Sequence, residues 1–130
     1  SAVIRSAEAL FVRGAIDDLR SAIPARQVCV AGDMNDDARS LALRILRGDA
    51  NPTGDGLLSA MDRVKEHKRF TALHRGKPSQ LDHLLLSADL FARLTGADVF
   101  NEDLYDHGPF VPGAPPSIES DHALHIATFG

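Results

Sequence analysis

Residues 27–37 read QVCVAGDMNDD, and this stretch decides the fold class. Its first part, residues 27–31, is a short run rich in β-branched residues and bounded by Pro24 and Gly32. Such a run predicts a strand that is buried on both faces, with Cys29 as a small core residue. Carboxylate and amide side chains follow at once. Because a carboxylate at the end of a buried strand stands on a rigid element and still reaches solvent, these residues form a first candidate site.

Helices are predicted on both sides of this strand. On residues 3–23 apolar side chains recur at three- and four-residue spacing, which is the pattern of an amphipathic helix. A second amphipathic helix is predicted over residues 37–47, with Asp36 or Asp37 as its N-cap and Gly48 as a left-handed C-cap. The expected core face of the first helix consists of Ala7, Leu10, Phe11, Gly14, Ala15, Leu19, Ala22 and Ile23.

The rest of the chain is mostly strand-like. Residues 57–64 suggest a short third helix, and residues 51–56 form a turn cluster. Residues 101–120 carry four Pro and two Gly without periodicity, which is typical of a functional loop. Because strands and helices interleave, we expect an α/β or α+β fold with a mixed, largely antiparallel sheet and helices on one face. The predicted strands are residues 69–74, 81–87, 96–100 and 122–129.

Composition narrows the possible classes of protein. The chain has 130 residues, 44% apolar and 25% charged, so one hydrophobic core is expected and two are not. A single cysteine excludes an internal disulfide, and the net charge of −4 argues against a strongly basic grip on nucleic acid. No apolar run is long enough to predict a membrane span, and no signal-peptide pattern is present, which favours the cytoplasm.

Two further polar clusters stand where strands are predicted to begin. Residues 80–87 read QLDHLLLS, and successive side chains of a strand point to opposite faces, so Asp82 and His83 cannot both serve one site. Asp82 shares a face with the apolar Leu84 and therefore needs a partner in the interior. Residues 120–122, Ser-Asp-His, open the last predicted strand.

The three polar clusters are residues 31–37, 80–87 and 120–122. They lie at one edge of the sheet if the strand ending at Ala31 runs antiparallel to the strands that begin at Leu81 and His122. Carboxylates, an amide and an imidazole crowded at one rim repel one another unless a cation or an anionic ligand organises them. Oxygen ligands favour Mg²⁺, Mn²⁺ or Ca²⁺, and an imidazole bonded to a carboxylate is oriented for proton transfer. The candidate site residues are Asp33, Asn35, Asp82, Asp121 and His122.

In their order and context, these motifs resemble the endonuclease/exonuclease/phosphatase superfamily, which includes deoxyribonuclease I-like nucleases, abasic-site endonucleases, inositol-polyphosphate phosphatases and sphingomyelinases. The family has Gly-Asp-Phe-Asn after a buried strand, a hydrophobic-Asp-His/Tyr/Arg strand start, and Ser-Asp-His before the final strand. The matching residues here are 32–35, 81–83 and 120–122. Met34 replaces the usual Phe, and Leu124 stands where the family often has Pro; both exchanges are minor.

The resemblance implies that a phosphoester is hydrolysed by in-line attack of activated water, assisted by Mg²⁺, Mn²⁺ or Ca²⁺. His122, paired with Asp82, would be the catalytic histidine, either as general base or as a protonated stabiliser of the phosphoryl charge. Asp33 would orient or deprotonate the water, and Asp121 would help hold the metal. Asn35 would donate a hydrogen bond to a phosphate oxygen. Asn35 and His122 would thus touch the substrate, which is a nucleic acid, a phospholipid headgroup or a small phosphoester.

The family fold is a four-layer αββα sandwich, much longer than this chain, whose first half supplies a metal-binding Asn and Glu and a Tyr or His that contacts phosphate. The resemblance therefore implies that residues 1–130 form a single unit, the C-terminal half of such a domain, with only part of the active site. One sheet face would then lack its partner and expose more apolar area than is normal on monomers. We expect another copy, another chain or the missing N-terminal half to cover it.

Two alternatives stay open at this point. In the first, the chain is a catalytically inactive fragment that serves as a folding or oligomerisation unit. In the second, His83, His122 and His125 form a zinc site. Strand alternation places His122 and His125 on opposite faces, which weakens the zinc alternative.

Overall fold

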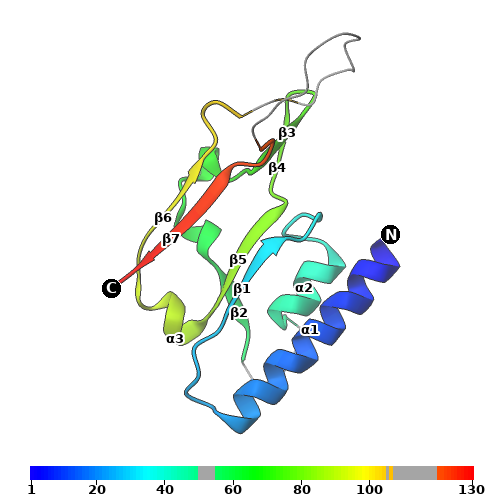
Figure 1. Cartoon of the computed structure of the whole chain (residues 1–130), viewed down its shortest axis with the longest axis vertical. Coiled ribbons are helices and arrows are strands. Elements are labelled where there is room, and N and C mark those ends of the chain that lie inside the picture. Colours follow the sequence, from blue (N-terminus) through cyan, green and yellow to red (C-terminus); the bar gives the residue numbers. More distant parts are fainter. Residues whose placement is uncertain (50–54, 105, 107–119) are drawn as a thin grey trace.

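The computed structural model describes residues 1–49, 55–104, 106 and 120–130 (Figure 1). Helices and antiparallel sheets combine in an α+β fold, as the sequence predicts. The helices are α1 (Ala2–Ala22), α2 (Leu41–Arg47) and α3 (Ala88–Phe91), and the 3-10 helices are η1 (Ala60–Arg63) and η2 (Glu66–Lys68). The strands are β1 (Cys29–Asp33), β2 (Leu57–Ser59), β3 (Ala72–His74), β4 (Lys77–Ser79), β5 (Asp82–Ser87), β6 (Leu94–Phe100) and β7 (Leu124–Phe129).

The strands form three antiparallel sheets, in the orders β1-β5-β2, β3-β4 and β6-β7. Strands β1 and β5 pair from Cys29 opposite Leu86 to Asp33 opposite Asp82. The predicted antiparallel course of these two strands is therefore confirmed, and the end of β1 lies beside the start of β5. Figure 1 shows that β7 also begins near the start of β5.

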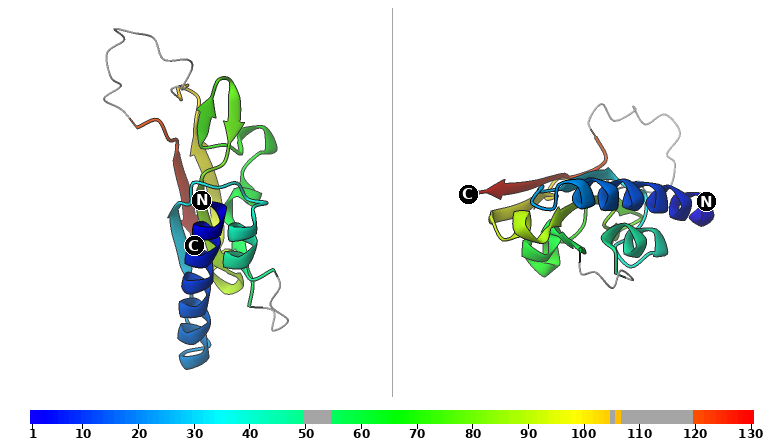
Figure 2. Two further views of the ribbon diagram at one scale, coloured as in Figure 1. Left: turned by 90° about the vertical axis from the view of Figure 1, so that its right-hand side faces the viewer. Right: turned by 90° about the horizontal axis from the view of Figure 1, so that it is seen from below.

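The core of the described residues forms three clusters, the smallest of which consists of Ala60, Leu86 and Leu94. Helices α1 and α2 pack on β1 and β5 through a cluster that includes Ile16, Leu43 and Leu85. Under the β6–β7 pair, η1 contributes Met61 to a second cluster with Val99. Figure 2 shows α2, α3 and η1 on the same side of the strands, which agrees with the predicted placement of helices on one face.

Helix α1 forms where the sequence predicts it but buries a different face. Leu10 and Phe11, expected in the core, are 61% and 80% exposed, whereas Arg13 is 6% exposed. The Arg13 guanidinium is tolerated inside because it donates to the Asp17 carboxylate at 2.6 Å and to the carbonyl oxygens of Leu46 and Asp55. No described helix, α1 included, has both the length and the apolar character that a membrane span requires.

The expectation that β1 is buried on both faces is wrong. Val30 packs against the helices, but Cys29 and Ala31 on the other face are exposed. On the β6–β7 pair the register sets Phe100 opposite Leu124, and these side chains are 54% and 63% exposed. An apolar sheet face therefore lies uncovered by the described residues, as expected from the sequence.

The two ends of α2 show which capping predictions were right. Gly48 adopts the predicted left-handed C-cap, with φ 78° and ψ 29°. The helix begins at Leu41 rather than at residue 37, because the Ser40 hydroxyl, not an aspartate, accepts the N–H of Leu43. Asp37 instead accepts the N–H of Arg39 in the turn before the helix.

Other local predictions differ from the structure or lie outside it. Residues 57–64 form β2 and η1 instead of a helix, since β2 pairs with β5. The strand predicted at residues 69–74 contains only β3, which makes a hairpin with β4 through Arg75 and Gly76, both at positive φ. Most of the turn at 51–56 and of the loop at 101–120 lies outside the described residues.

Candidate active site

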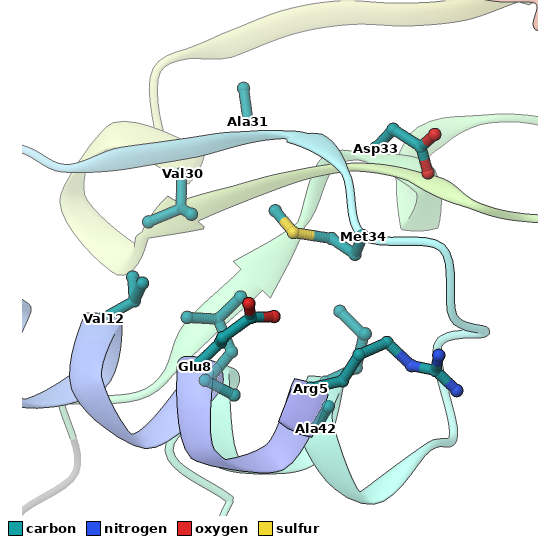
Figure 3. Close-up of a pocket in the computed structure, with 11 residues that line it drawn as sticks. Arg5, Glu8, Val12, Val30, Ala31, Asp33, Met34 and Ala42 are labelled. Carbon is teal, nitrogen blue, oxygen red and sulfur yellow. The ribbon is translucent and has the colours of Figure 1, made fainter. Parts of the chain in front are cut away.

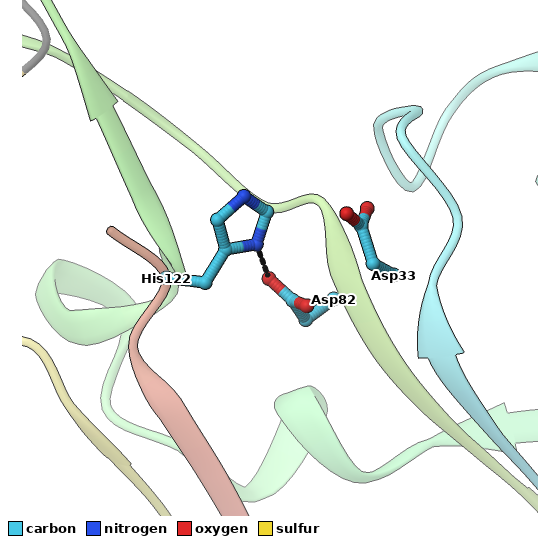
Figure 4. Close-up of side chains that lie close together, drawn as sticks. All are labelled: Asp33, Asp82 and His122. Atoms are coloured by element: carbon cyan, nitrogen blue, oxygen red, sulfur yellow. Dashed lines mark hydrogen bonds and ion pairs between the residues drawn. The ribbon is translucent and has the colours of Figure 1, made fainter. Parts of the chain in front are cut away.

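Two carboxylates face each other at the rim where β1 ends and β5 begins. Asp33 and Asp82 are cross-strand partners, and the N–H of Met34 donates to the carbonyl oxygen of Leu81 in the next pair. Asp33 and Asp82 therefore form a non-hydrogen-bonded pair, the kind in which facing side chains approach most closely. Neither is deeply buried. Asp33, Asp82 and His122 have ligand atoms within 4.8 Å of one another (Figure 4).

His122 is bound directly to the second carboxylate. Its Nδ1 lies 2.7 Å from Asp82 Oδ2, so the Nδ1–H donates to the carboxylate and Nε2 is left facing the rim. Burial acts to lower the pKa of His122, but the hydrogen bond to Asp82 and the charge of Asp82 outweigh it. The pKa is raised as a result, with further contributions from Asp33 and Asp121.

A threonine that the sequence did not single out holds this pair in place. Thr71 is fully buried, and its Oγ1 accepts the N–H groups of Leu81 and Asp82 at 3.0 and 3.1 Å. Its carbonyl oxygen accepts the N–H of Ala123 at 2.8 Å, next to His122. Thr71 therefore ties the start of β5 to the segment before β7. The sequence gives no signal for this role, because threonine is common in strands and the contacts of Thr71 join residues that are far apart in the chain.

The loop after β1 is shaped by the first carboxylate. Asp33 Oδ1 accepts the N–H of Asn35 at 2.8 Å, and Asn35 adopts a positive φ of 48°, which Asn tolerates better than most residues. Asn35 is exposed. Asp36 then forms an ion pair with Arg5 of α1 at 3.0 Å, which anchors the loop to the helix.

Asp121, the predicted metal ligand, lies next to the imidazole ring of His122. Asp121 Oδ1 lies 4.0 Å from His122 Nε2, and the Asp121 side chain is 42% exposed. The structure thus gathers Asp33, Asp82 and His122 in one cluster with Asp121 beside it. Asn35 joins the cluster through its backbone.

His83 points away from this cluster, as strand alternation predicts. It is 2% exposed, its Nε2 lies 2.8 Å from the carbonyl oxygen of Asp36, and its Nδ1 lies 3.1 Å from Gln80 Nε2. A neutral ring with the proton on Nε2 satisfies both contacts, and burial lowers the pKa of His83. Both nitrogens are therefore engaged, and the zinc site of His83, His122 and His125 does not form.

His125 occupies the inner face of β7. Both of its ring nitrogens are shielded from solvent and have no hydrogen-bond partner among the described residues. Burial, followed by the nearby His83, lowers the pKa of His125. Asp33, Asp82 and His122 remain the one group of metal-ligating side chains within the described residues. Oxygen donors with one imidazole suit hard ions such as Mg²⁺ or Mn²⁺.

Comparison of the chain with models of known protein families, with curated proteins and with solved structures finds no match. The resemblance of its three motifs to the endonuclease/exonuclease/phosphatase superfamily therefore stays a prediction.

Proposed function

We propose that this chain carries the hydrolytic residues of a metal-dependent phosphoesterase, in which activated water attacks a phosphoester. The observation that supports this most is the Asp82–His122 hydrogen bond of 2.7 Å with the Asp33 carboxylate beside it. A carboxylate-oriented imidazole next to a second carboxylate is suited to moving protons between water, substrate and leaving group.

Each residue has a role that its surroundings favour. Because the pKa of His122 is raised, its ring keeps a proton on both nitrogens up to a higher pH than an ordinary histidine does. The Nε2–H can then stabilise charge on the phosphoryl group or protonate the leaving oxygen. Asp82 orients the ring and supports its charge. Asp33 orients the attacking water, and Asn35 donates to a phosphate oxygen.

The proposed hydrolysis also requires a divalent cation. Asp121, beside His122, is the carboxylate that would help to hold Mg²⁺, Mn²⁺ or Ca²⁺. When bound, the ion would offset charge on the phosphoryl oxygens. The acidic rim also needs such a cation before an anionic substrate can approach it, because its carboxylates repel phosphate.

The experiment is hydrolysis of bis-p-nitrophenyl phosphate, with and without Mg²⁺ or Mn²⁺. We expect metal-dependent activity that falls by about 10²–10⁴-fold in Asp33→Ala and in His122→Ala. His67→Ala is the matched control, because His67 is exposed and lies outside the cluster. Metal-independent hydrolysis, or equal activity in His122→Ala and His67→Ala, would contradict the proposal.

The second candidate function is that of an inactive folding or oligomerisation unit, favoured by the exposed apolar side chains of α1, β6 and β7. Phe11 and Val3 on α1 are 80% and 79% exposed, and exposed apolar side chains that gather in a patch mark protein–protein contacts. Under this alternative no hydrolysis occurs, and the mass measured by light scattering exceeds that of one chain. Phe11→Glu would return it to one chain.

A further inference from the structure

The outer edge of β1 carries an open row of backbone hydrogen-bonding groups. β1 lies at the end of its sheet and pairs only with β5. Bonds from the N–H of Met34 to Leu81 and from the N–H of Ser87 to the carbonyl oxygen of Val28 show that even-numbered residues of this strand point toward β5. The odd-numbered residues therefore point their N–H and C=O groups outward, and no described residue bonds to them. These residues are Cys29, Ala31 and Asp33.

A groove runs along this open edge. A cavity of about 360 Å³ lies between β1, α1 and α2. Figure 3 shows Val12 of α1 and Val30 of β1 pointing into it from opposite sides, with Glu8 reaching toward β1. Leu43 and Leu46 of α2 also line it. The groove thus offers apolar surface beside unpaired backbone groups.

The edge has one charged side chain, Asp33 at its end, and none of the other usual protections against added strands. Natural edge strands are guarded by lysine, proline, bulges or a covering element. Residues 29–33 read CVAGD, contain neither lysine nor proline, and pair with β5 without a register shift. Helix α1 stands beside the edge, but Cys29, Ala31 and Asp33 are all exposed, so the described residues leave this row of groups uncovered.

We propose that the edge of β1 accepts an extended peptide strand from a partner protein, by β-strand addition. Backbone hydrogen bonds to Cys29, Ala31 and Asp33 would supply the pairing, and the groove would take small apolar side chains at alternate positions. Glu8 has no partner among the described residues and reaches into the groove, so it favours a basic residue in the peptide. A second copy's β1 fits less well, because α1 flanks the same edge in each copy (Figure 1).

The test uses a labelled nine-residue peptide that begins with lysine and then alternates valine and threonine. Fluorescence anisotropy measures its binding to the full chain, and the same peptide N-methylated at alternate amides is the peptide control. We expect saturable binding, lost with the N-methylated peptide. Ala31→Pro should weaken binding about tenfold, because it removes one outward N–H and leaves the bonds to β5 intact.

A matched pair of variants tests the groove. Val12→Trp fills it and should weaken binding about tenfold or more, whereas Ala7→Trp on the outer side of α1 should leave binding unchanged. Glu8→Lys should weaken binding of the lysine-led peptide but not of one led by glutamate. Equal binding by the Val12 and Ala7 variants would overturn the groove as the docking site.

Amide hydrogen exchange of the unaltered chain keeps the proposal falsifiable if Ala31→Pro does not fold. The amides of Cys29, Ala31 and Asp33 should exchange fast in the free chain and slow down when the peptide is added. Protection that rises with protein concentration and needs no peptide would assign the edge to a second copy. That result, or no slowing with peptide, overturns the proposal, and neither result bears on phosphoester hydrolysis.

Discussion

At the start of β5, each face of the strand is associated with a different histidine, and the pKa values of the two histidines shift in opposite directions. On the side toward the helices, His83 is buried and satisfied by Asp36 and Gln80 in its neutral form, and its pKa is lowered. On the other side, Asp82 receives the Nδ1–H of His122, and the pKa of His122 is raised. The same side-chain type is structural in one place and suited to chemistry in the other, because burial dominates the first and a carboxylate the second.

Among the variants that test this comparison of the two histidines, the largest effect should come from removing the charge of Asp82. In Asp82→Asn the ring of His122 keeps a neighbour of similar size, but burial is no longer outweighed by a carboxylate, so the pKa of His122 falls. We expect hydrolysis of bis-p-nitrophenyl phosphate to drop by about 10²–10³-fold. NMR titration should show a large fall in the pKa of His122 and a smaller fall at His83, whose pKa the charge of Asp82 also raises. If the pKa of His122 is the same in Asp82→Asn as in the unaltered chain, the Asp82 carboxylate is not what raises it.

The next effect concerns Thr71, which ties the start of β5 to the segment before β7. Thr71→Val keeps the shape of the side chain but leaves the N–H groups of Leu81 and Asp82 without their acceptor. We expect a loss of about 1–3 kcal/mol in the free energy of unfolding, measured in urea. Thr71→Ser keeps the hydroxyl and should recover most hydrolytic activity. If Val and Ser variants lose activity equally, Thr71 does not position Asp82.

Replacing the buried His83 by leucine should lower the free energy of unfolding, because polar groups around it lose hydrogen bonds. Leucine has no ring nitrogens, so the carbonyl oxygen of Asp36 loses its partner and the Gln80 amide keeps only its 3.4 Å bond to the carbonyl oxygen of Asp82. We expect about 1–2 kcal/mol lower free energy of unfolding. His67→Leu is the surface control and should be nearly neutral. Equal stability of the two variants would show that His83 is not a structural residue.

The smallest effect is the pH dependence of stability, and its sign differs between the two histidines. Because the folded pKa of His83 is lowered, its contribution is present above the unfolded pKa of about 6.5 and is lost as the pH falls below it. Because the folded pKa of His122 is raised, its contribution is present below about 6.5 and is lost as the pH rises through the folded value. Urea unfolding from pH 5 to 8 should therefore show a steeper fall in acid for His122→Gln than for the unaltered chain. A shallower fall would reverse the assignment.

Several parts of the site follow from local pattern. Alternation along residues 82–87 separates Asp82 from His83 whatever the surroundings, because the side-chain period of a strand is two. The run of residues 27–31 predicts a strand with a carboxylate directly after it, and the structure has β1 at Cys29–Asp33, two residues further along. What local pattern missed is Thr71, since its contacts join segments ten and more residues away.

Patterns of sequence establish the order of helices and strands in this chain, because hydrophobic spacing and caps act within a few residues. They could not decide which face of α1 turns inward: the apolar stripe around Leu10 and Phe11 stays outside, while Arg13 is buried by partners on α2 and near β2. Local pattern also could not decide that Asp82 binds His122, forty residues away; only the motif resemblance implied that pair, and the structure has it. Those outcomes depend on which distant groups can satisfy a buried charge, and only the folded arrangement supplies them.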